Sequence, residues 1–101
     1  MSSARTIVDD YLEALGFNKE ETRLYLALVK HGPATILEAS RLTNIERTRL
    51  YRLIDTLRER GLLEEVPQYK RRTIKAADIS TIELLAKERE RRDTFLKHSF
   101  S

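Results

Sequence analysis

The three glycines of this 101-residue chain divide it into helical segments of limited length. Gly16, Gly32 and Gly61 each directly follow a stretch whose apolar residues recur every three or four positions, the spacing of an amphipathic helix. Glycine is typical just after the end of a helix because it adopts a left-handed conformation without a steric penalty. The sequence therefore predicts separate short helices that end at these three positions.

The composition fits one folded domain inside the cell. Hydrophobic residues make up 41% and charged residues 35% of the chain, so we do not expect global disorder. The longest apolar run, Leu24–Val29, has six residues, whereas a membrane-spanning helix requires about 20. The chain has no cysteine, and no apolar segment typical of a signal peptide follows its first residues. We expect a cytoplasmic protein with no membrane partner.

The sequence offers no group of residues that an enzyme would need. Its three glycines are scattered and form no phosphate-binding loop, and its two histidines, His31 and His98, are far apart. No nucleophile stands next to a base, and no spacing typical of metal ligands occurs. We therefore expect no enzymatic activity, no catalytic residue, no metal site and no cofactor.

The middle of the chain has the pattern of a helix-turn-helix motif. Thr35 and Glu38 form a Thr-x-x-Glu capping box, which predicts a short helix to about Leu42 with that leucine pointing inward. A turn follows, in which we expect Ile45 to enter the core. A longer helix is then predicted over 46–60, with one narrow apolar stripe. The stripe consists of Leu50, Leu53, Ile54 and Leu57.

After Gly61 the apolar period changes, and residues 62–66 and 71–76 predict a two-stranded hairpin. A last helix is expected from about Asp78. Together with the earlier helices, this order predicts a mainly α fold with a small β-hairpin (α+β), a winged helix-turn-helix with flanking N- and C-terminal helices. We expect a DNA-binding domain over 5–78 and a C-terminal helix over 79–100 that contributes to dimerisation.

Positive charge is concentrated in the part of the chain that holds the predicted motif. Residues 41–75 contain 10 basic and 5 acidic side chains, a net charge of +5. Residues 1–40 have a net charge of −2, and residues 76–101 are balanced. A localised basic stretch is typical of a surface that faces nucleic acid, although it is also found on ordinary solvated surfaces.

The helix predicted over 46–60 has the properties of a recognition helix in the major groove. Its polar face is opposite the apolar stripe, so it could lie in the groove while its back is anchored in the core. Arg52 suits a guanine edge and Thr48 a base or phosphate, whereas Asp55 would repel phosphates unless it pairs with a base or with Arg52. The predicted DNA contacts on this helix are Arg47, Thr48, Arg49, Tyr51 and Arg52.

The predicted wing, about 66–76, carries a second group of cations. Three consecutive basic residues, next to a tyrosine at the hairpin tip, suit the phosphate backbone or the minor groove. The same charges would also protect an exposed edge strand against pairing with another sheet. The predicted contacts here are Tyr69, Lys70, Arg71 and Arg72. If five to seven cations of both groups neutralise phosphates, the salt slope of DNA binding should be about −4 to −6.

Two stretches of the chain together resemble the start of the TrmB-type winged-helix transcriptional regulators, over about residues 7–78. The matching motifs are Leu15-Gly16-Phe17-Asn18, Glu21, Arg23–Leu28, Lys30-His31-Gly32-Pro33, Thr35, Glu38, Ile45–Tyr51, Leu57, Gly61-Leu62-Leu63 and Pro67. The resemblance implies transcriptional control by binding to double-stranded DNA, usually as a homodimer, and it extends more distantly to MarR- and ArsR-type repressors. Family members often carry a ligand-sensing domain after the winged helix, for which this sequence has no room. The sequence is therefore either a short stand-alone form or a fragment of a longer protein, and it identifies no effector.

The sequence also bears on protein partners, and it leaves an alternative to DNA binding open. Apolar residues in the first and last helices exceed what one small core needs, which favours a homodimer through these helices. The alternative function is a winged-helix protein-interaction module of a transcription or assembly complex. The basic residues at 47–52 and 70–72 argue against that alternative, while Glu46 and Asp55 argue for it.

Overall fold

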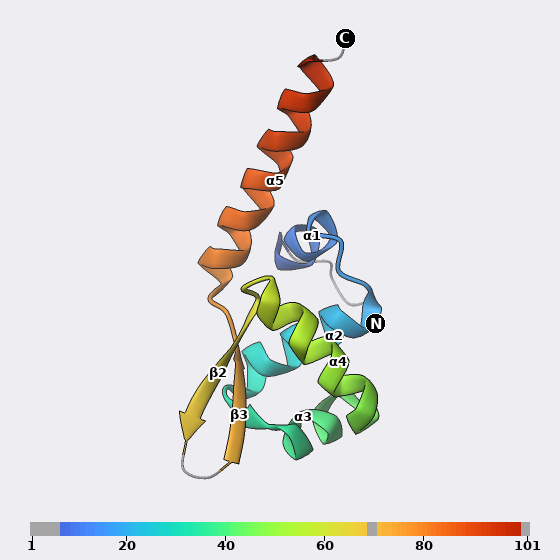
Figure 1. Ribbon diagram of the computed structural model, residues 1–101, viewed down its shortest axis with the longest axis vertical. Coiled ribbons are helices and arrows are strands. Elements are labelled where there is room, and N and C mark those ends of the chain that lie inside the picture. The colour runs from blue at the N-terminus through green and yellow to red at the C-terminus, as the bar shows by residue number, and fades with distance from the viewer. Residues whose placement is uncertain (1–6, 69–70, 100–101) are drawn as a thin grey trace. The chain divides into compact units, whose positions relative to one another are not determined.

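The computed structural model describes the backbone of residues 7–68 and 71–99, which divides into two compact units. The central unit, residues 19–77, holds three helices and three strands; the terminal unit combines the two ends of the chain. The central elements are α2 (Lys19–His31), β1 (Ala34–Thr35), α3 (Ile36–Thr43), α4 (Arg47–Glu59), β2 (Leu63–Gln68) and β3 (Arg71–Ala76) (Figure 1). The terminal elements are α1 (Ile7–Ala14) and α5 (Ile79–Ser99).

The capping box predicted from the sequence starts α3. The Thr35 hydroxyl accepts a hydrogen bond from the backbone N–H of Glu38 at 3.2 Å, and the Glu38 carboxylate accepts one from the backbone N–H of Thr35 at 2.9 Å. Two backbone donors that the first turn of a helix leaves without partners are thereby satisfied. The helix begins at the predicted residue.

Removal of this cap has a measurable effect on stability. Thr35→Ala is expected to lower the free energy of unfolding by about 1 kcal/mol, because the N–H of Glu38 loses its acceptor. Urea unfolding followed by circular dichroism measures the change. Thr35→Ser, which keeps the hydroxyl, serves as the control and should retain most of the stability. Equal losses in both variants would show that the methyl group of Thr35 matters and the cap does not.

The turn between α3 and α4 is held by side chains of α3. Asn44 adopts the left-handed conformation with φ 58°, and the Ser40 hydroxyl donates to the carbonyl of Ile45 at 2.7 Å. Ile45 is buried, as predicted. Leu42, however, is 45% exposed, so the prediction that it points inward is wrong. Thr43 takes the inward position, where its hydroxyl donates to the carbonyl of Ala39 at 2.7 Å, which satisfies the buried oxygen.

The apolar stripe anchors α4 in the core of the central unit. Leu50, Ile54 and Leu57 are fully buried, and Leu53 at the edge of the stripe is partly exposed. The helix is followed by Gly61, which has φ 78°, and the N–H of Leu62 donates to the carbonyl of Leu57 at 2.8 Å. These contacts fix the polar face of α4 on the side of the helix away from the core.

The hairpin belongs to a three-stranded antiparallel sheet in the order β1-β3-β2. In β2 and β3, Leu63 pairs with Ala76 and Gln68 with Arg71. The short strand β1 pairs its Ala34 with Ile74, a contact that the sequence analysis did not predict because two residues show no alternation. The sheet is tied to α2 by the buried Tyr25 hydroxyl, which donates to the carbonyl of Ala77 at 2.6 Å.

In the terminal unit, α1 packs against α5. The chain leaves α1 through Gly16, which has φ 82°, and Arg89 of α5 donates from Nη1 to the carbonyl of Leu15 at 3.2 Å. A cation at this end of a helix is favoured by the helix dipole. Leu12 and Ile82 are fully buried. The first and last helices of the chain therefore form one structural unit.

Residues 7–68 and 71–99 contain neither a helix suited to cross a membrane nor a candidate metal-binding group. No helix there combines the length and the apolar character that a membrane crossing demands. Nor do histidine or acidic side chains of this part of the chain gather into a group that could hold a metal ion.

Candidate nucleic-acid interface

The N-terminal half of α4 presents an exposed polar surface. Arg47, Thr48, Tyr51 and Arg52 are all exposed; Thr48 and Arg52 lie opposite the buried Leu50, and Arg47 and Tyr51 lie on one flank of the helix. Arg47 and Arg52 form no ion pair with any other side chain that the structure describes. Both guanidinium groups are therefore available to an external anion.

Arg49, on the same helix, is engaged within the protein. Its Nε lies 2.6 Å from Oε1 of Glu20, a residue of the first turn of α2. Arg49 was predicted as a DNA contact, but the structure turns its flank of the helix toward α2. An exposed pair of this kind adds little stability, so an external phosphate could still compete for Arg49. In the folded chain, however, Nε of Arg49 is already engaged by a carboxylate.

Arg72 of the predicted wing lies against α4. Its Nε donates to Oε1 of Glu65 at 2.9 Å, and its Nη2 is 3.5 Å from Oδ1 of Asp55. Its guanidinium carbon lies 5.8 Å from the centre of the Tyr51 ring, within the range of a cation–π contact. The hydrogen bond with Glu65, and then the charges of Glu65 and Asp55, raise the pKa of Arg72 above its ordinary value.

Asp55, which would repel phosphates if it were alone, has cationic partners. Oδ1 of Asp55 is 3.7 Å from Nη2 of Arg58 and 3.5 Å from Nη2 of Arg72. Arg52 was the side-chain partner expected from the sequence, but Asp55 pairs with these two arginines instead. Arg58 also contacts Glu65, at 2.5 Å. We call Asp55, Arg58, Glu65 and Arg72 the wing–helix network.

The tip of the predicted wing falls partly outside the described residues. The predicted contacts Tyr69 and Lys70 lie outside the described residues. For Arg71 the structure describes only the backbone, which pairs with that of Gln68. Lys75, further along β3, is exposed. The predicted contact residues of α4 are thus brought together on one helix, with Arg72 beside them.

Sequence reasoning missed Glu20, Arg58 and Glu65. Two signals for this group were present in the sequence. The first is the spacing of Asp55 and Arg58, which are three residues apart on one face of the helix. The second is the position of Glu65, two residues after the buried Leu63, which places the two side chains on the same side of the hairpin, facing the core. These spacings alone do not predict that the hairpin contacts α4.

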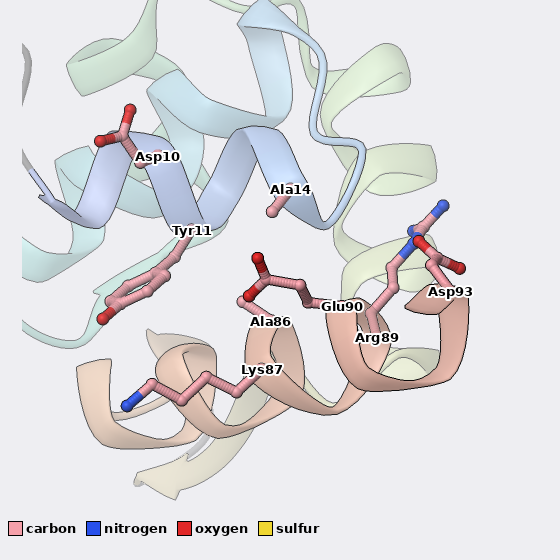
Figure 2. A pocket seen from close by; sticks show the side chains of 8 residues that line it. All are labelled: Asp10, Tyr11, Ala14, Ala86, Lys87, Arg89, Glu90 and Asp93. Atoms are coloured by element: carbon pink, nitrogen blue, oxygen red, sulfur yellow. The ribbon is translucent and has the colours of Figure 1, made fainter. Parts of the chain in front are cut away.

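The terminal unit contains a cleft of about 370 Å³ between α1 and α5. Figure 2 shows Glu90 of α5 extending toward α1, below Ala14 and to one side of the Tyr11 ring. The charged residues around it are exposed and of both signs, so no single charge dominates that would select an anion or a cation. They are Asp10, Lys87, Arg89, Glu90 and Asp93.

Solved structures of a MarR family transcriptional regulator and of MarR itself share this fold. A MarR family transcriptional regulator from Silicibacter pomeroyi DSS-3 matches with a TM-score of 0.58 and 25% identity, over 82% of this chain and 64% of that one. Wild-type MarR from E. coli in its apo form matches with a TM-score of 0.64 and 16% identity, over 80% of this chain and 63% of that one. This chain thus spans less than two thirds of the length of either protein.

A third structure, PKZ Zalpha in complex with ds(CG)6, matches over its whole length and 61% of this chain, with a TM-score of 0.56 and 21% identity. No curated protein sequence matches the chain. The model of the family described as "Sugar-specific transcriptional regulator TrmB" matches residues 12–80. The match covers more than half of the chain, and the family and the fold are those of DNA-binding transcriptional regulators. The chain therefore belongs to the TrmB family and has the winged helix-turn-helix fold.

Proposed function

We propose that the chain binds double-stranded DNA sequence-specifically, with the recognition helix (46–60) in the major groove and the wing (66–76) on the backbone or in the minor groove. One observation carries the proposal: the buried side of α4 is apolar, and its exposed surface carries Arg52 opposite the apolar stripe and Arg47 on one flank, neither with a carboxylate partner among the residues that the structure describes. A single α-helix fits the major groove, which is about 12 Å wide. That PKZ Zalpha was solved with a duplex supports the use of this fold on double-stranded DNA.

Each residue of the surface has a proposed role. Arg52 and Thr48 face the bases, because they lie opposite the buried stripe, and Arg52 reads a guanine edge. Arg47, Tyr51 and the wing cations Lys70 and Arg71 contact phosphates, which position the helix without reading sequence, and Arg72 reaches a phosphate only in competition with its carboxylate partner. No enzymatic step is part of this function, and a cytoplasmic location fits it.

A homodimer is the proposed active form. The terminal unit exposes large apolar side chains on both of its helices, which favours a second copy as the partner. They are Ile7, Ile79 and Leu84. Two-fold symmetry would place the two copies of α4 about 34–36 Å apart on a palindromic site. Selection of bound sites from random DNA tests this arrangement, because a palindrome with that spacing is the expected product and a single half-site would contradict the dimer.

The salt dependence of binding separates DNA from a protein partner. Since Arg49 and Arg72 are paired with carboxylates, we expect the slope of log K against log[salt] to be about −4 per domain, the shallow end of the range for five to seven cations. Fluorescence anisotropy on a random duplex at several salt concentrations measures it. Lys30→Gln, a charge change outside the proposed surface, should leave the slope unchanged.

A flat salt response would favour the alternative function, a winged-helix module that binds another protein. Exposed aliphatic side chains of the central unit favour this alternative, because they could contact another protein. They are Val29, Leu37 and Leu42.

A further inference from the structure

The wing–helix network joins side chains from three elements. On α4, Tyr51, Asp55 and Arg58 are spaced as i, i+4 and i+7, so they form one stripe along the helix. On the hairpin, Glu65 and Arg72 lie diagonally across the β2–β3 ladder, in which Glu65 pairs with Ile74. Ile74 is buried, so this face of the hairpin is turned toward the core and α4. The network therefore lies at the junction of the proposed recognition helix and the wing.

In this network, two cations are balanced by two carboxylates. Arg72 is held at both Nε and Nη2, which lie 2.9 and 2.8 Å from Oε1 of Glu65. The Glu65 carboxylate also contacts Nη1 of Arg58. The side chains of Arg72 and Glu65 are 34% and 37% exposed, so solvent reaches both. Ion pairs at this exposure contribute little to stability, and the main effect of the network is on the charge that the surface presents.

We propose that Glu65, assisted by Asp55, withholds Arg72 and Arg58 from DNA phosphates and thereby lowers non-specific affinity. This inference rests on the proposed function of α4 and the wing. Non-specific binding is almost wholly a matter of how many phosphates are neutralised, whereas base contacts add the specific part. Among the described residues, no carboxylate forms an ion pair with Arg47 or Arg52 on α4. The two carboxylates therefore set the ratio of specific to non-specific binding.

The physical reason is a competition between two partners for one guanidinium. On any sequence, a phosphate must displace Glu65 to gain the full charge of Arg72, which reduces the net gain from that contact. On the specific site, base contacts of α4 fix the protein, and Glu65 keeps Arg72 and the wing aligned with the helix. Loss of the carboxylate thus adds a phosphate contact everywhere but loosens the wing on the specific site.

Glu65→Gln tests the proposal, because glutamine has the same shape without the charge. We expect the affinity of the full chain for a random duplex to rise about threefold to tenfold, and the salt slope to steepen by about 0.9, as for one added phosphate contact. Affinity for the selected site should rise less, so the specificity ratio should fall. Glu59→Gln is the matched control: Glu59 is an exposed residue of α4 with no ion pair to any side chain in the described ranges.

Asp55→Asn provides a second, graded test. Its two ion pairs are longer, at 3.5 and 3.7 Å, so the increase in non-specific affinity should lie between those of Glu65→Gln and Glu59→Gln. Circular dichroism confirms that each variant is folded. Equal salt slopes for Glu65→Gln and Glu59→Gln would overturn the inference, as would weaker binding of Glu65→Gln to a random duplex. Failure of the unmodified chain to bind any duplex would instead overturn the proposed function.

Discussion

Replacement of Leu50 with alanine is expected to lower the free energy of unfolding by about 2–5 kcal/mol. Leu50 is fully buried, so the change removes apolar contacts and leaves a cavity that the surrounding side chains fill only in part. A domain of this size has about 5–15 kcal/mol of stability, so the loss is a large part of the total. Because Leu50 anchors the N-terminal half of α4, DNA binding should also weaken at temperatures where the protein is still folded.

Urea unfolding and a parallel DNA titration measure the two effects of Leu50→Ala. Leu42→Ala is the matched control, since it makes the same chemical change at a side chain that is 45% exposed. That variant should differ from the unmodified protein by no more than about 0.5 kcal/mol. If both alanine variants lost the same stability, the anchoring of α4 through its apolar stripe would be incorrect.

The second large effect is expected on DNA recognition. Arg52→Ala should weaken binding to the selected site by about 1–3 kcal/mol and relax the preference for one base pair, because a bidentate contact to guanine is lost. Binding to a random duplex should change far less. Competition titrations with single-base variants of the site locate the relaxed position.

Arg71→Ala provides the contrast with Arg52→Ala. Arg71 is assigned to the backbone-contacting wing, so its loss should weaken binding to all sequences alike and make the salt slope shallower by about 0.9. If both variants reduced affinity uniformly, Arg52 would be a phosphate contact and another residue of α4 would read the bases. Unchanged affinity in both would contradict the assignment of this surface.

Local signals in the sequence predicted the helices and their ends well. The capping box of Thr35 and Glu38 and the glycine at position 61 act through hydrogen bonds and backbone angles within a few residues, so they can be read directly. Leu42 was misplaced because α3 ends within one residue of it. At the end of so short a helix the stripe has no further turn to define it, and Thr43 occupies the buried position.

Contacts between distant segments could not be predicted in the same way. Arg49 and Glu20 are 29 residues apart, and Arg72 and Asp55 are 17 apart, so their pairing depends on how α2 and the hairpin approach α4. Arg49 and Arg72 were therefore predicted to be ordinary DNA contacts. Which residues form the surface was predictable from charge and helical spacing, but which cations are already paired within the protein was not.

The hydrogen bond from Arg89 to the carbonyl of Leu15 spans 74 positions of the chain and has a practical consequence for anyone who shortens the protein. A truncation before Arg89 removes the side chain that donates a hydrogen bond at the C-terminal end of α1. Deletion of α1 removes the helix against which α5 packs. Shortened variants should therefore keep both α1 and α5 or lack both, because either helix alone would lose its packing partner.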